Sequence, residues 1–206
     1  SFPTRRSSDL GRNVAIKKPV ERGRNVSEIG SDVPAGTTLI AAGERIGPAQ
    51  IALLASMGRT EALAGRRPRT AIFATGSELL PPGSPLSPGK IRDSNSAMLA
   101  AQVESAGGEP VLCGMLPDDP DAIGRAVSEA LESCDLVITA GGVSVGDFDH
   151  VAALLTARPE ELLFNKIMMR PGSVTSAAVR GGKPHLALSG NPGACFAGLD
   201  RKSVVE

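Results

Sequence analysis

The sequence predicts an α/β fold: three layers, with a mostly parallel sheet covered by helices on both faces, and a small elongated N-terminal attachment. Two observations carry this prediction. Residues 68–200 alternate short, strongly apolar segments with helix-like segments, at the spacing of repeated β-α-β units. Residues 13–67 instead contain short apolar pairs broken by turn residues, and they are too loosely apolar to form much core alone.

The N-terminal attachment is expected to span residues 13–67. NVAIKKPV, at 13–20, alternates apolar and polar side chains and predicts a short strand. PAQIALLASMG, at 48–58, predicts a helix that stops at its final glycine. The two ends, SFPTRRSSDL and RKSVVE, break the patterns beside them. We therefore expect residues 1–12 and 201–206 to be foreign to the natural protein, and the rest to be an internal fragment of a longer one.

The larger unit, a second domain over residues 68–200, is expected to contain six strands and four helices. In chain order these are a strand at 70–76, a helix at 92–107, a strand at 109–116, a helix at 119–133, a strand at 135–142, a helix at 147–157, strands at 161–169, 173–182 and 183–190, and a helix from residue 192. Ligands of parallel α/β folds bind at the carboxyl ends of the strands. The segments ATGSEL, TAGGVSVGDFD and LSGNP lie at such ends.

Composition excludes several classes of protein. Aromatic residues make up only 2% of the chain, so stacking platforms for single-stranded nucleic acid are not expected. The three cysteines have neither CxxC nor Cys/His spacing, which argues against a zinc site and a disulfide framework and fits a reducing cytoplasm. No apolar run approaches the ~20 residues of a membrane span. The sequence therefore predicts a cytoplasmic protein that binds neither nucleic acid nor membranes.

A glycine-rich loop, TAGGVSVGDFDH, follows one of the buried strands. Gly141, Gly142 and Gly146 let the backbone approach a ligand, and loop N–H groups can bind a phosphate. The pattern is neither a P-loop nor GxGxxG, so a tight strand–helix connection explains it equally well. Asp147 and Asp149 favour a ligand site, because carboxylates at a helix start either cap the helix or bind Mg²⁺ beside a phosphate.

Other charged side chains follow the predicted strands. Glu78 comes directly after the first buried strand, where a lone Glu is usually a solvated charge. Asp118 and Asp119 precede a helix with Pro at its start, for which ordinary capping is the simplest interpretation. Lys166 and Arg170 have an even spacing on a predicted strand. They are therefore expected on one face, either as an oxyanion site or as an outward polar stripe.

These groups are expected to converge at the strand ends of one sheet. The turn LSGNPG adds a helix start whose free N–H groups can bind an anion. Residues 71–206 carry 10 basic and 16 acidic side chains, against 12 and 6 in residues 1–70. Two differently charged surfaces explain most of this asymmetry, although an acidic half also suits a bound cation. The convergence predicts a phosphorylated or oxyanionic substrate held with a hard divalent metal.

Together these segments resemble the molybdopterin molybdenumtransferase family, the MoeA proteins and the gephyrin E domain. The resemblance runs from about Asn13 to Leu199 and rests on ATGSEL, IRDSN, PDDP, TAGGVSVGDFD, NKIMMRPGS and LSGNP in this order. It implies the molybdopterin-binding fold. It also implies insertion of molybdate into adenylated molybdopterin with release of AMP, in a Mg²⁺-dependent step of molybdenum cofactor biosynthesis, by a homodimeric parent protein.

The resemblance also implies roles for individual residues. The implied catalytic residues are Glu78, Asp119 and Asp149, and the implied metal ligands are Glu78, Asp118 and Asp149. The substrate-binding residues fall into a pterin-side segment, the glycine loop, two cations and the final loop: Asp93, Ser94, Asn95, Gly141, Gly142, Ser144, Gly146, Lys166, Arg170, Asn191 and Pro192. The resemblance leaves open which of Asp118 and Asp119 is functional.

The sequence departs from the family pattern in three motifs. Ser77 takes the usual Asp place, Ser173 replaces the second Lys of Lys-Pro-Gly-Lys-Pro, and Ser189 begins the final loop in place of Pro. Two further domains of the family are not recognisable, so we expect the chain alone to be poorly active. A molybdopterin adenylyltransferase-like enzyme and a non-catalytic binding or scaffold module of the same fold stay open as alternatives. The 13–67 attachment favours the transferase, because the adenylyltransferases are compact single domains.

Overall fold

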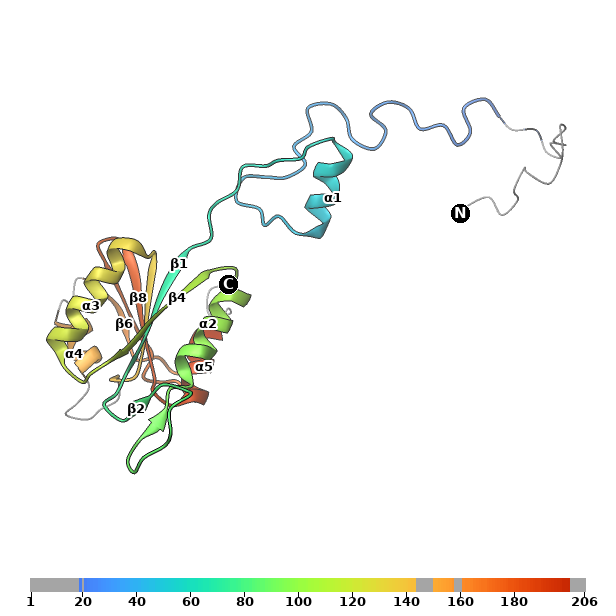
Figure 1. Cartoon of the computed structure of the whole chain (residues 1–206). Helices are drawn as coiled ribbons and strands as arrows, with labels where there is room; N and C mark the ends of the chain where they lie inside the picture. The colour runs from blue at the N-terminus through green and yellow to red at the C-terminus, as the bar shows by residue number, and fades with distance from the viewer. Residues whose placement is uncertain (1–18, 20, 144–149, 158–160, 201–206) are drawn as a thin grey trace. The chain divides into compact units, whose positions relative to one another are not determined.

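The computed structural model describes residue 19 and residues 21–143, 150–157 and 161–200, in two compact units divided between Ala64 and Gly65. The boundary predicted at 67/68 lies three residues from this division. Each unit is described by itself (Figure 1). Among the described helices, none is long and apolar enough to cross a membrane.

The first unit contains one described helix, α1 (Pro48–Ser56), which confirms the helix predicted there. Pro48 occupies the first turn, where its missing N–H costs nothing. The Gln50 side chain accepts a hydrogen bond from the Gly47 backbone N–H at 3.1 Å. No residue in the described part of this unit is buried, in line with its loose apolar pattern. The strand predicted at 13–20 lies outside the described residues except for Pro19.

The second unit is built on a six-stranded sheet of order β4-β1-β5-β8-β7-β6. Four neighbouring strands are parallel, and the last two run antiparallel to their neighbours, which confirms a mostly parallel sheet. In chain order the strands are β1 (Arg69–Thr75), β4 (Glu109–Leu116), β5 (Leu136–Ala140), β6 (Leu162–Asn165), β7 (Ser176–Arg180) and β8 (Lys183–Leu188). Two short parallel strands, β2 (Leu79–Leu80) and β3 (Ile91–Arg92), form a separate arm.

Helices cover both faces of the sheet, which confirms the three-layer prediction (Figure 1). α2 (Asn95–Ser105) and α5 (Pro192–Asp200) contact each other on one face. α3 (Pro120–Ser133) and α4 (His150–Thr156) contact each other on the other face. Because β4, β1, β5 and β8 are parallel neighbours, their carboxyl ends meet at one edge, and the four helices of this unit begin there.

The core consists of two aliphatic clusters, one on each face of the sheet. On the α3 and α4 side, Ala71 and Phe73 pack with Val127 and Val151. On the α2 and α5 side, Ile72 packs against residues that include Leu99, Ile138, Leu188 and Cys195. Successive β1 side chains enter opposite clusters, as the twofold alternation of a strand requires. A strand buried on both faces is what the continuous apolar run AIFA, at 71–74, predicts.

His185 lies at the centre of the sheet and is fully buried. Its Nε2 bonds Thr139 Oγ1 at 3.1 Å, between β8 and β5. Burial, with a smaller contribution from the positive charge of Arg180, lowers the pKa of His185 from 6.5 to about 3. The neutral imidazole therefore belongs to the folded state.

We expect the free energy of unfolding to fall as the pH falls from about 6.5 towards 3. In that window the unfolded histidine binds a proton and the folded one does not, which gives a slope of at most ~1.4 kcal/mol per pH unit. Urea unfolding between about pH 7 and 4.5 measures this slope while most carboxylates stay ionised. A His185→Leu variant should flatten it. An equal slope in the variant would contradict the assignment.

Candidate functional site

The carboxyl ends of β1 and β4 are joined through Ser77 and Asp118. The Ser77 backbone N–H and its hydroxyl donate to Asp118 Oδ2 at 3.0 and 2.9 Å. The Gly76 N–H also donates to the Leu116 carbonyl at 3.3 Å. Glu78 extends back across Gly76, since a Cβ at that glycine would lie 2.6 Å from a Glu78 carboxylate oxygen. Two carboxylates therefore lie at the same sheet edge, and that of Asp118 is held by a backbone and a hydroxyl donor.

The ends of β1 and β5 are in close contact through Thr75 and Gly141. A Cβ at Gly141 would lie 2.4 Å from the Thr75 carbonyl oxygen and 2.6 Å from its Oγ1, and the φ of Gly141 is +112°. Only glycine allows the two strands to approach this closely. Gly142 continues the turn at φ +64°, and its carbonyl accepts a bond from Val151 N at the start of α4. The structure thus shows these glycines in a close approach of two strands, while their expected role in the approach of a ligand stays a prediction.

The loop after β8 completes the row of strand ends. The Gly141 N–H donates to the Leu188 carbonyl at 2.9 Å, and a Cβ at Gly190 would lie 3.5 Å from Gly141 Cα. Asn95, at the start of α2, donates from Nδ2 to the Gly190 carbonyl at 2.8 Å. Its Oδ1 is buried and has no hydrogen-bond partner within the described residues. The predicted substrate-binding residues Asn95, Gly141 and Gly142 and the loop that carries Asn191 are therefore linked.

Three of the predicted polar residues have roles at helix starts. Asp119 Oδ1 accepts from Asp121 N at 3.1 Å and caps α3. Asn191 Oδ1 accepts from the N–H groups of Gly193 and Ala194 at the start of α5, where Pro192 is the first helical residue. Asp93 Oδ1 accepts from Ser96 N, while Ser94 holds the N-cap position of α2 without a side-chain bond. Asp119 is thus a capping residue, and its predicted catalytic role stays a prediction.

The expectation that Lys166 and Arg170 share one face of a strand is wrong. β6 ends at Asn165, and Lys166 has a φ of +69°, which turns the chain out of the extended conformation. Both residues lie in the irregular, exposed segment between β6 and β7. This segment is packed near α5, because a Cβ at Gly172 would lie 3.2 Å from the Ala194 carbonyl oxygen.

The predicted magnesium ligands are only partly described. Of the three, Asp149 lies outside the described residues, as do Asp147 and the predicted substrate-binding residues Ser144 and Gly146. Within the described part of the chain, no group of three or more His, Cys, Asp or Glu side chains is placed to hold a metal ion. Glu78 is exposed and Asp118 is half-buried, and both offer the carboxylate oxygens that Mg²⁺ prefers. Because Asp118 Oδ2 bonds Ser77, Oδ1 is the oxygen through which Asp118 suits a cation.

Sequence reasoning missed two residues of this edge. Thr75 packs against Gly141 and Gly142, which its position before the ATGSEL glycine could have suggested. Lys90 donates from Nζ to the Ser77 carbonyl at 2.5 Å, and no motif marked it. By contrast, a cavity of about 590 Å³ between α2 and α5 includes Pro68 and Leu136 at the amino ends of strands, so it lies away from this edge.

A parallel sheet with glycine turns, carboxylates and helix starts at one edge defines a ligand-binding α/β domain. Residues 71–203 match the family model described as "Probable molybdopterin binding domain", and the chain belongs to that family. Residues 4–58 match the model described as "MoeA N-terminal region (domain I and II)". The resemblance to the molybdopterin molybdenumtransferases is thereby confirmed. The second match includes residues 4–12, whose foreign origin stays a prediction.

Individual relatives agree with the family match. The chain is 43% identical over 187 residues to the molybdopterin molybdenumtransferase of Bacillus subtilis (strain 168), covering 91% of this chain and 44% of the relative. It is 43% identical over 192 residues to that of Staphylococcus aureus (strain Mu50 / ATCC 700699), covering 93% and 46%. The crystal structure of the molybdopterin biosynthesis MoeA protein from Pyrococcus horikosii superposes with a TM-score of 0.68 at 32% identity, covering 82% and 43%. The chain thus spans less than half the length of these relatives.

Proposed function

We propose that this chain is the substrate-binding part of a molybdopterin molybdenumtransferase. The parent enzyme inserts molybdate into adenylated molybdopterin and releases AMP, in the molybdenum cofactor pathway of the cytoplasm. One observation carries the proposal: the ends of β1, β4, β5 and β8 join Ser77, Asp118, Gly141 and Gly190 into one continuous edge. Carboxylates beside close-packed glycine turns suit a phosphorylated ligand with a divalent cation.

In this proposal the residues bind and orient the substrate. Glu78 and Asp118 hold Mg²⁺, which supplies Lewis-acid polarisation of the phosphoryl oxygens when bound. Asp118 is preferred to Asp119 as the functional acid, because the Asp119 carboxylate already caps α3. Asn95 offers its buried, unpartnered Oδ1 to a donor on the pterin. Lys166 and Arg170 attract molybdate from the exposed segment, and the parent protein is a homodimer.

One observation favours the molybdenumtransferase over each of the two alternatives. The match of residues 4–58 to the MoeA N-terminal region favours it over a single-domain adenylyltransferase. The two carboxylates at the glycine-rich edge favour an enzyme over a binding module without catalysis.

We expect the 206-residue chain to bind adenylated molybdopterin but to release AMP slowly. A misplacement of ~1 Å in an incomplete site can cost ~10²-fold in rate. Binding is measured by calorimetry, and turnover by AMP release with molybdate and Mg²⁺, with the Bacillus subtilis relative as the positive control. Absence of binding would contradict the proposed function. Turnover equal to that of the relative would contradict only the view that the site is incomplete.

A further inference from the structure

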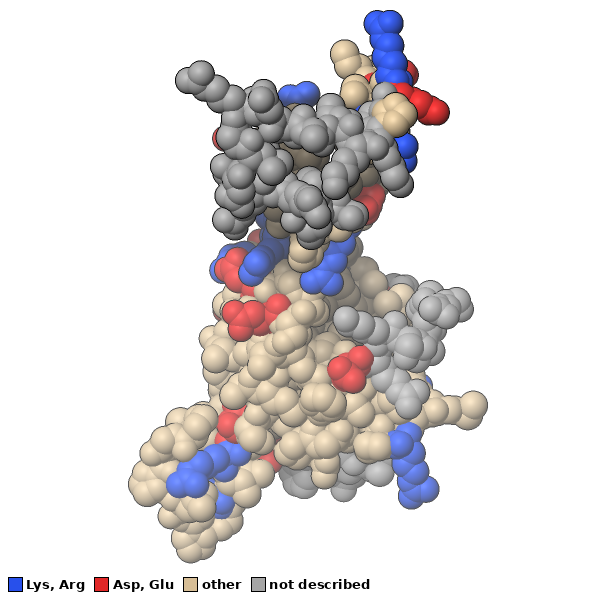
Figure 2. All heavy atoms as spheres, turned by 90° about the vertical axis from the view of Figure 1, so that its right-hand side faces the viewer, with Lys and Arg blue, Asp and Glu red and all other residues tan. Residues whose placement is uncertain are grey.

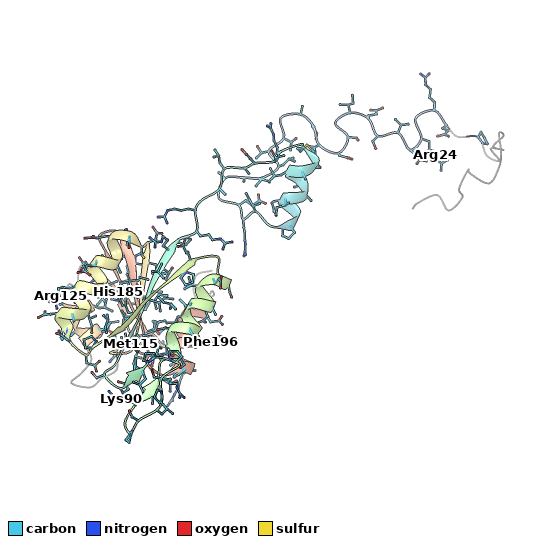
Figure 3. The ribbon with its side chains drawn as sticks, viewed as in Figure 1. Arg24, Lys90, Met115, Arg125, His185 and Phe196 are labelled. Carbon is cyan, nitrogen blue, oxygen red and sulfur yellow. The ribbon has the colours of Figure 1, made fainter. Side chains whose placement is uncertain are left out.

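The arm formed by β2, β3 and the residues between them projects from the carboxyl edge of the sheet (Figure 1). It spans residues 79–92, contains Lys90 and Arg92, and has no acidic residue. Figure 2 shows basic side chains gathered on this projection at the lower left, and Figure 3 labels Lys90 on it. The arm therefore brings positive charge to the edge that carries Glu78 and Asp118.

Lys90 is tied directly to the strand-end network. Its Nζ donates to the Ser77 carbonyl at 2.5 Å, and Ser77 in turn donates twice to Asp118 Oδ2. Ser77 thus links the arm to the end of β1 and, through Asp118, to the end of β4. Ser77 directly precedes Glu78 in the chain, so the ammonium bonded to its carbonyl lies at the same edge as both carboxylates.

The arm holds Lys90 in place before any ligand arrives. The Ile91 N–H donates to the Glu78 carbonyl at 3.0 Å, and the Asp93 N–H donates to the Leu80 carbonyl at 2.8 Å. Arg92 Nε closes the arm internally by donating to the Ser84 carbonyl at 3.0 Å. Prolines fix the φ of four further arm residues, which limits the entropy that binding would cost: Pro81, Pro82, Pro85 and Pro88.

The present partner of Lys90 is a neutral carbonyl. No carboxylate in the described part of the chain lies within ion-pair distance of its ammonium. An ammonium has three donors, so it can keep the Ser77 bond and still donate to another acceptor. A phosphate oxygen carries a full negative charge and adds Coulombic attraction that the partial charge of a carbonyl does not match. A phosphate oxygen at this edge is therefore a better acceptor for Lys90 than any group it now contacts.

We propose that Lys90 is an additional substrate-binding residue that donates to a phosphate oxygen of the nucleotide-bearing substrate. The inference rests on the proposed function and adds a cation on the arm side of the site, opposite in sign to Glu78 and Asp118. Glu78 and Asp118 would hold the metal, and the Lys90 ammonium would donate directly to a phosphate oxygen.

The test is calorimetric titration of the full 206-residue chain with AMP and with inorganic pyrophosphate, both with Mg²⁺. Lys90→Gln should weaken binding ~10-fold, which corresponds to ~1.4 kcal/mol. Lys90→Arg keeps the charge and should stay within about threefold of the unsubstituted chain. Arg92→Gln removes a charge from the same arm but leaves Lys90 in place, and should change affinity less than about twofold.

If the unsubstituted chain binds and Lys90→Gln binds equally well, Lys90 is not a ligand residue, while the proposed function stands. If Arg92→Gln weakens binding as much as Lys90→Gln, the arm acts through its overall charge and the specific assignment is overturned. If the unsubstituted chain binds neither probe, both the inference and the proposed nucleotide chemistry are overturned. Thermal melting of the variants checks that the exposed substitutions leave the fold intact.

Discussion

Gly141→Ala is expected to destabilise the second unit by about 2–5 kcal/mol and to abolish ligand binding at the sheet edge. The new methyl group would lie 2.4 Å from the Thr75 carbonyl oxygen, and the backbone would keep a φ of +112° that L residues rarely adopt. Relief of the overlap separates β5 from β1 and disturbs the Gly141 N–H bond to Leu188. Urea unfolding and calorimetric binding measure the two losses.

Gly182→Ala is a matched control, because it introduces the strain of a positive φ without the steric overlap expected at Gly141. Gly182 has a φ of +78° in the β7–β8 turn, and a Cβ there would have nothing within 4 Å. Gly182→Ala should therefore cost only the ~1–2 kcal/mol of the left-handed conformation and leave ligand binding unchanged. If Gly141→Ala were no more harmful than Gly182→Ala, the close approach of β1 and β5 would not be what Gly141 provides.

Asp118→Asn is expected to weaken Mg²⁺ binding at least ~10-fold, the lower end of the losses seen when the surroundings of a metal are altered. The amide oxygen still accepts from Ser77, so the link between β1 and β4 is kept while the charge is lost. The melting temperature should change little. Calorimetric titration with Mg²⁺, repeated with pyrophosphate present, measures the effect.

The neighbouring Asp119 provides the opposite case. Its carboxylate caps α3 through Asp121 N, so Asp119→Ala should cost ~1 kcal/mol of stability and leave Mg²⁺ affinity unchanged. The reverse result, with Mg²⁺ affinity lost in Asp119→Ala and retained in Asp118→Asn, would transfer the metal role from Asp118 to its neighbour.

Much of the fold was predictable from local pattern. AIFA, at 71–74, is apolar without interruption, as suits a strand buried on both faces, and α3 begins at Pro120 after an acidic cap, as its sequence indicates. The strand predicted at 161–169 was too long, since the segment after Asn165 is equally apolar in sequence but turns at Lys166. Apolar periodicity does not reveal a single residue in the left-handed conformation. It therefore predicts Lys166 and Arg170 on a strand that ends before them.

The site was predictable where it depends on strand ends, and not where it depends on individual contacts. Gly141 and Gly142 follow a buried strand, which places them at the carboxyl edge by topology alone. Asp118 and Asp119 are adjacent in sequence, and only the positions of Ser77 and Asp121 distinguish them. Lys90 is 13 residues from Ser77, across a proline-rich arm whose path no periodicity specifies.

In the proposed function, the ends of β1, β4, β5 and β8 form the molybdopterin site. Hydrogen exchange, followed by mass spectrometry with and without adenylated molybdopterin and Mg²⁺, tests it most directly. We expect slower exchange at residues 75–79, 140–143 and 189–193, with α1 and residues 66–69 at the amino end of β1 unchanged. Protection confined to α2 and α5 around the 590 Å³ cavity, with the strand ends unaffected, would contradict it.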